Sequence, residues 1–150
     1  MKLAIGADHG GYELKEEIIS LLKEMNIDYE DLGCNCEDSV DYPDYGLPVA
    51  EKVANGEVDR GIVICGTGIG MSIAANKVKG IRCALVHDLF TAKLTREHND
   101  TNVLAMGARV IGPGLATEIA RVWLSTEFEG GRHEKRIGKI TEYEQRVKEE

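Results

Sequence analysis

The sequence has little of what marks disordered, disulfide-stapled or membrane proteins. It contains only 3 prolines in 150 residues, aromatic residues make up 5%, and the apolar runs are no longer than a strand. A membrane-spanning helix needs about 20 consecutive apolar residues, so no segment is expected to cross a membrane, and no signal peptide is expected before residue 2. A chain of this length is expected to form one domain over residues 1–150, in the cytoplasm.

Positive charge is scarce as well. The net charge of −8 argues against binding to nucleic acid, whose phosphates require a basic surface. One stretch after residues 130–131 is an exception, and it contains Arg132, His133, Lys135, Arg136 and Lys139. Arg132 and Arg136 are four residues apart and would share one helix face, which suits a small phosphate. A solvated helix face is the alternative interpretation.

Cysteine motifs with zinc spacing are also missing. The four cysteines, at positions 34, 36, 65 and 83, include no paired CxxC motif. This pattern predicts neither a disulfide scaffold nor a metal site, and it is typical of a reducing compartment.

Strand patterns and helix patterns alternate along the whole chain. Strands are expected over 2–7, 29–32, 61–65, 82–86 and 103–108, and helices over about 12–25, 47–54, 71–77, 89–97, 114–125 and 133–148. This order predicts an α/β fold with a single doubly wound, Rossmann-like sheet of five parallel strands, helices on both faces and a C-terminal helix. Ligands of such sheets bind beyond the carboxyl ends of the strands, where the strand order reverses.

The segment after the third strand carries the strongest indication of chemistry. Cys65 ends the strand, and Gly66, Gly68 and Gly70 follow at alternate positions. Glycines let the backbone approach a ligand closely, and the next helix directs its first N–H groups to the same place. A thiol in that field is expected to ionise more readily than one in water. The segment therefore offers a nucleophile or base beside amides that can hold an oxyanion.

Polar residues after the first and second strands are expected at the same edge of the sheet. Asp8 and His9 end the first strand, and Tyr42 lies in the polar turn 41–45 after the second. These residues would then face Cys65, although a helix cap, a core histidine and a plain turn are the alternative interpretations.

Three other chemistries do not fit the glycine segment. A dinucleotide fingerprint and a cysteine phosphatase would need, respectively, a glycine and an arginine where Met71 stands, and a P-loop needs Gly-Lys-Ser/Thr.

His98 does not fit the predicted edge. It ends a helix that starts at the ligand side and runs back for about ten residues, or roughly 15 Å. His98 is therefore either an ordinary C-terminal helix histidine or part of the site of another subunit.

Five segments together resemble the ribose-5-phosphate isomerase B (RpiB/LacAB) family of sugar-phosphate isomerases. They are IGADHGG at 5–11, DYPD at 41–44, CGTGIGMSIAANK at 65–77, EHN at 97–99 and GARVIG at 107–112. The resemblance implies an aldose–ketose isomerase of the pentose phosphate pathway that interconverts ribose 5-phosphate and ribulose 5-phosphate without a metal or an organic cofactor. An isomerase of allose 6-phosphate or galactose 6-phosphate is the alternative, and a non-catalytic sugar-phosphate binding module is a third reading.

The resemblance also implies roles for individual residues. Cys65 would move a proton between C1 and C2, with Met71 where another branch of the family has a glutamate. Thr67 and His98 would open the sugar ring. The substrate-binding residues would be Asp8, His9, Tyr42, Gly66, Gly68, Ile69, Gly70, Asn99, Arg109, Arg132 and Arg136. Family members are dimers with shared active sites, and a tetramer is a further expected state.

Overall fold

The computed structural model describes residues 1–35 and 37–149, with side chains up to residue 147. Cys36, one of the four cysteines, lies outside the described residues. The strands form one parallel sheet in the order β2-β1-β3-β5-β4. Their bounds are β1 Lys2–Ala7, β2 Asp28–Asp31, β3 Arg60–Cys65, β4 Cys83–Leu85 and β5 Val103–Gly107.

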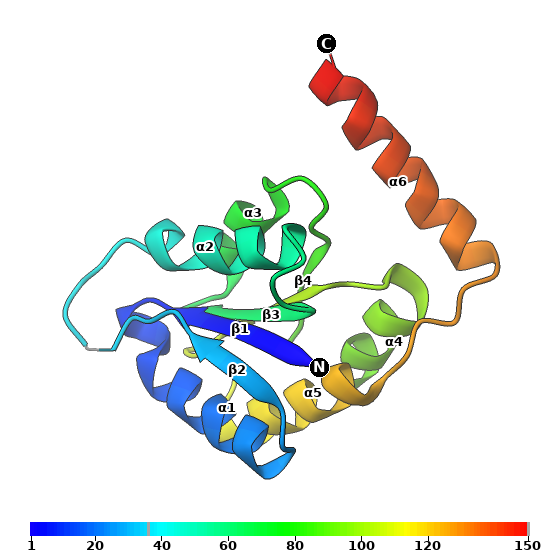
Figure 1. The fold of residues 1–150 in the computed structure, drawn as a ribbon. Helices are drawn as coiled ribbons and strands as arrows, with labels where there is room; N and C mark the ends of the chain where they lie inside the picture. The colour runs from blue at the N-terminus through cyan, green and yellow to red at the C-terminus, as the bar shows by residue number, and fades with distance from the viewer. Residues whose placement is uncertain (36, 150) are drawn as a thin grey trace.

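The helices cover both faces of this sheet (Figure 1). They are the short η1 His9–Gly11, α1 Tyr12–Glu24, α2 Pro43–Ala54, α3 Ile69–Asn76, α4 Leu89–Asn99, α5 Pro113–Ser125 and α6 Arg132–Glu149. Helices α2 and α3 pack on one face, and α1, α4 and α5 pack on the other. The predicted doubly wound fold with a C-terminal helix is confirmed.

One helix boundary differs clearly from the sequence prediction. Helix α2 begins at Pro43 and not near residue 47, because a proline is compatible with the first helical position, where its missing N–H has no acceptor.

The two faces of the sheet carry side chains of different size. Leu3, Ile5, Ile62 and Ile64 face α1 and α5, where Trp123 is completely buried. The alternate positions carry smaller groups, such as Ala4, Val63 and Cys65, and face α2 and α3. Because strand side chains alternate between faces, Cys65 lies on the side of the sheet that α3 covers.

The strand order reverses between β1 and β3. From this pair, β2 lies beyond β1 and β5 lies beyond β3. The loops after β1 and β3 therefore lead to helices on opposite faces, and a ligand is expected to bind beyond the carboxyl ends of these two strands.

Helix α6 extends away from the body of the molecule (Figure 1). Its apolar residues Ile140, Tyr143 and Val147 are 59%, 60% and 48% exposed. Within the described ranges, no helix combines the length and the apolar character needed to cross a membrane.

Candidate active site

The loops after β1 and β3 lie in contact. The Asp8 N–H donates to the Ile64 carbonyl at 3.2 Å, and the Asp8 carboxylate accepts from the Gly11 N–H at 3.1 Å, which caps the short helix η1. A Cβ on Gly11 would lie 2.7 Å from the Ile64 carbonyl oxygen, so only glycine allows this approach. Asp8 is thereby held beside Cys65 and is itself 8% exposed.

Cys65 is buried and has a hydrogen-bond donor at its sulfur. It is 5% exposed, and its Sγ accepts from the Gly68 N–H at 3.2 Å. Gly68 has φ +80°, a left-handed conformation that favours glycine, and it immediately precedes α3. The sulfur therefore lies at the amino-terminal end of α3, beside a backbone N–H donor.

Some backbone N–H groups of the glycine loop form hydrogen bonds within the loop, and others are placed to bind an oxyanion. The Gly68 N–H serves the Cys65 sulfur, and the Ile69 N–H donates to the Thr67 hydroxyl at 3.3 Å. The first hydrogen bond of α3 runs from the Ser72 N–H to the Gly68 carbonyl. The N–H groups of Gly70 and Met71 precede that bond and point out of the first turn, where an oxyanion would be stabilised.

Two side chains lie against this loop. The Tyr42 ring covers Gly70 so closely that a Cβ there would be 2.6 Å from it. The Arg109 side chain lies along Gly66, because a Cβ on Gly66 would be 3.5 Å from the Arg109 Cδ. The backbone N–H of Arg109 donates to the Gly66 carbonyl at 2.9 Å. Tyr42 and Arg109 are both exposed, so they can also contact a ligand.

A cavity of about 470 Å³ is lined by His9 and Arg109 and also by the carboxylates of Glu13, Glu17 and Glu37. His9 Nδ1 accepts from the Val40 N–H at 3.1 Å. The proton of the neutral ring is therefore on Nε2, which can donate to a phosphate oxygen. The sequence offered no indication of this contact, because the donor is a backbone group 31 residues away.

His87 supports the loop from the neighbouring strands. Its Nε2 accepts from the Gly107 N–H at 2.9 Å. Gly107 in turn packs against Thr67, since a Cβ on it would be 2.5 Å from the Thr67 carbonyl group. Partial burial lowers the pKa of His87, while Asp88 opposes this shift. Protonation of His87 would remove the acceptor for Gly107.

This contact predicts a loss of stability in mild acid. The pKa of His87 is lower in the folded protein than its unfolded value of about 6.5. The contribution of neutral His87 to the stability of the fold is therefore complete above about pH 6.5 and is lost as the pH falls through the folded pKa. In His87→Gln, the amide oxygen can still accept but cannot be protonated. We expect urea unfolding between pH 7 and 5 to show a smaller decline in stability for this variant than for the wild type. Equal slopes would contradict the assignment.

His98, Asn99, Arg132 and Arg136 form a second cluster. His98 and Asn99 lie in the last turn of α4, and the two arginines lie one turn apart at the start of α6. Together they line a cavity of about 260 Å³.

The two clusters lie at opposite ends of the strands of the sheet. The end of α4 is joined to the end of α5 by a hydrogen bond of 3.1 Å from Arg96 to the Thr126 carbonyl, and Arg60 at the start of β3 donates to the Trp123 carbonyl at 3.0 Å. Cys65 is at the other end of this six-residue strand, roughly 16 Å away. The structure thus brings together Asp8, His9, Tyr42, Cys65 and Arg109, but not His98 with Cys65.

Known proteins are similar to this chain in sequence and in fold. Residues 3–140 match the model of the family described as Ribose/Galactose Isomerase. The chain is 70% identical to a protein called putative sugar phosphate isomerase YwlF from Bacillus subtilis (strain 168), over 97% of this chain and 99% of the relative. The solved structure of ribose-5-phosphate isomerase B from Clostridium thermocellum has a TM-score of 0.96 and 56% identity, covering 98% of this chain and 99% of that one.

A ligand-bound structure is also similar. Ribose-5-phosphate isomerase B from Mycoplasma genitalium, with bound ribulose 5-phosphate, has a TM-score of 0.92 and 44% identity, covering 96% of both chains.

Proposed function

The chain belongs to the ribose/galactose isomerase family, and from this we propose how its residues interconvert ribose 5-phosphate and ribulose 5-phosphate. The protein is an aldose–ketose isomerase of sugar phosphates. The observation that carries the assignment of its chemistry is the Cys65 sulfur, buried at the end of β3 with the Gly68 N–H donating to it.

Cys65 is the base of the proposed reaction. Its thiolate removes the proton from C2 of the open-chain aldose, and the electron pair of that bond forms a C1–C2 double bond while charge moves to the C1 oxygen. The resulting enediolate lies near the first-turn amides of α3, including Gly70. A proton moves from the C2 oxygen to the C1 oxygen, and the Cys65 thiol returns its proton to C1, which leaves the ketone at C2.

The other residues open the ring and hold the substrate. We assign ring opening to Thr67 and His98, and contacts with sugar hydroxyls to Asp8 and Asn99. Tyr42 and the glycine loop border the reacting end of the sugar. The phosphate is bound by His9, Arg109, Arg132 and Arg136.

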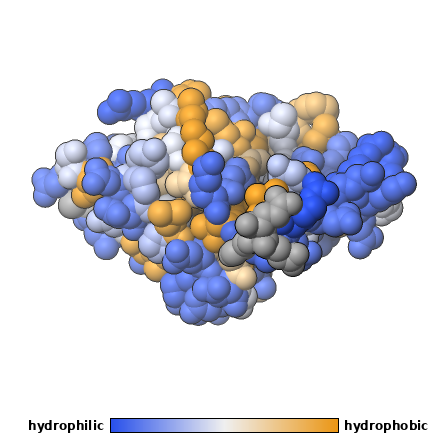
Figure 2. Space-filling model, turned by 90° about the horizontal axis from the view of Figure 1, so that it is seen from above, coloured by the Kyte–Doolittle hydropathy of each residue, from blue (hydrophilic) through white to orange (hydrophobic). Residues whose placement is uncertain are grey.

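These assignments require two subunits in one site. The clusters of Cys65 and His98 lie at opposite ends of the strands of one subunit. One substrate molecule therefore cannot reach both clusters of the same subunit. A homodimer related by a two-fold axis would place the His98 cluster of one subunit over the Cys65 cluster of the other. Ile69 and Ile73 on α3 are exposed apolar side chains and support burial against a second copy. Figure 2 shows hydrophobic groups at the surface among hydrophilic ones. A tetramer is compatible with the same contact.

A cytoplasmic location is part of the proposal. Cys65 and Cys83 are free thiols, and a catalytic thiolate stays reduced most readily in that compartment.

The substrate is tested by comparing kcat/KM on ribose 5-phosphate, allose 6-phosphate and galactose 6-phosphate. We expect ribose 5-phosphate to be preferred. Preference for either hexose phosphate would favour the alternative isomerase, and the absence of turnover of all three would favour a binding module.

Removal of Arg136 is expected to lower kcat/KM only for the phosphorylated substrate. A charge-assisted hydrogen bond contributes about 1.5–3 kcal/mol, so Arg136→Ala should lower kcat/KM for ribose 5-phosphate by roughly 10- to 150-fold. The reaction with unphosphorylated ribose should change little. Lys139→Ala, which removes another exposed positive charge from the same helix, is the control and should leave kcat/KM for both sugars unchanged. Equal losses for both sugars in Arg136→Ala would show a structural role.

A further inference from the structure

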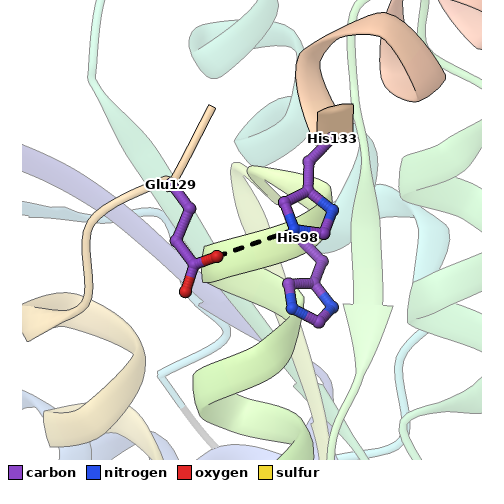
Figure 3. A group of neighbouring side chains, drawn as sticks. All are labelled: His98, Glu129 and His133. Atoms are coloured by element: carbon purple, nitrogen blue, oxygen red, sulfur yellow. Dashed lines mark ion pairs between the residues drawn. The ribbon is translucent and has the colours of Figure 1, made fainter. Parts of the chain in front are cut away.

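Three possible metal ligands meet at the end of α4 (Figure 3). His98 comes from α4, His133 from the first turn of α6, and Glu129 from the segment before α6. The two imidazole rings are stacked with centroids 4.1 Å apart and planes at 14°. One ligand atom from each of the three residues lies within 4.8 Å of the others. The spacing 98, 129, 133 matches no zinc motif in the sequence.

The buried nitrogen of His133 is the second observation that indicates a ligand at this cluster. His133 is 5% exposed, and its Nε2 has no hydrogen-bond partner among the described residues. The nearest carboxylate oxygen, Glu129 Oε2, is 3.6 Å away, which is too long for a hydrogen bond. Buried polar atoms are nearly always satisfied, so this nitrogen is expected to have a partner that the described residues do not supply.

Burial and the neighbouring positive charges both favour the neutral form of His133. Burial lowers the pKa of His133, and His98, Arg132 and Arg136 lower it further, while Glu129 raises it. A neutral imidazole has the lone pair that a metal requires.

We propose that His98, Glu129 and His133 bind zinc or a similar first-row divalent ion, and that the bound ion inhibits the enzyme. Two imidazoles and one carboxylate form a known zinc ligand set, with a fourth position for water. Ligand atoms around tetrahedral zinc lie roughly 3.3 Å apart, close to the 3.6 Å between Glu129 and His133. His98 completes the set by turning its ring, which is half-buried in the last turn of α4.

The inhibition, but not the binding, rests on the proposed function of His98. A metal at His98 occupies the lone pair that the residue needs to accept a proton during ring opening. Arg132 and Arg136 line the same cavity and repel a cation, so we expect micromolar affinity. Magnesium and calcium prefer all-oxygen sites and should not bind.

Binding is tested on the chelator-treated, dialysed wild type and two variants. Titration with zinc should show one site per chain, and cobalt should give visible d–d absorption without a thiolate charge-transfer band. Glu129→Gln should weaken zinc binding about tenfold or more and leave the metal-free activity unchanged. Glu127→Gln is the control, because it removes a neighbouring exposed charge and should bind zinc like the wild type.

The outcomes separate the two parts of the proposal. Undetectable zinc binding, or binding that is lost in Cys65→Ala and kept in Glu129→Gln, would overturn the site. Zinc that binds in a Glu129-dependent way without inhibiting isomerisation would overturn the inhibition and also the proposed role of His98. Inhibition that is reversed by EDTA and weakened in Glu129→Gln supports both parts.

Discussion

Cys65→Ala is expected to abolish isomerisation while substrate binding stays nearly intact. A general base contributes roughly 10²–10⁴-fold to the rate, and the buried Cys65 sulfur is the proposed base. The phosphate-binding residues supply most of the affinity and are unaffected. The measurements are kcat on ribose 5-phosphate and the dissociation constant of the variant for the same sugar phosphate.

Cys83→Ala is the matched control for this variant. Cys83 is in the edge strand β4, and burial raises its pKa to about 12, so this thiol stays protonated and is not a base at neutral pH. We expect Cys83→Ala to keep wild-type kcat. Turnover by Cys65→Ala within about tenfold of the wild type would disprove the role of Cys65. Partial loss of deuterium from C2 to solvent would independently support the enediolate, whereas complete retention would indicate a hydride shift.

Mixing two inactive variants is expected to restore activity. If Cys65 and His98 of different subunits share a site, Cys65→Ala and His98→Ala homodimers each lack one essential group in both sites. A hybrid dimer has one site with both mutations and one site with neither. Statistical mixing makes half of the dimers hybrid, so about a quarter of wild-type activity should return after joint unfolding and refolding.

Hybrid formation must be measured separately from activity. Different affinity tags on the two variants allow the hybrid to be purified, and the purified hybrid should have about half of the wild-type activity. Separately refolded homodimers are the controls and should remain inactive. Purified hybrids without activity would show that His98 acts within its own chain, and the proposed dimeric site would then be wrong.

The fold was largely predictable because its signals are local. Alternating apolar runs located all five strands to within one or two residues, with β1 matching at Lys2–Ala7. The glycines after Cys65 also predicted a ligand loop, since the left-handed Gly68 and the close approach of Tyr42 to Gly70 both require glycine at those positions. Even the distance of His98 from Cys65 followed from the length and direction of one helix.

The order of the outer strands was not predictable in the same way. β5 lies between β3 and β4, although β4 precedes it in the sequence. Which edge of the sheet accepts a strand depends on how the intervening helices pack, and neighbouring residues do not encode that choice.

The sequence by itself determined the elements, the glycine loop and Cys65, because periodicity and backbone preference act between neighbours in the chain. Only the tertiary structure decided which distant groups meet. It brought the Val40 N–H to His9, the Gly107 N–H to His87, and Glu129 to His133 beside His98. The physical reason is that a contact between distant residues is set by the packing of whole helices on the sheet, which no local pattern of side chains specifies.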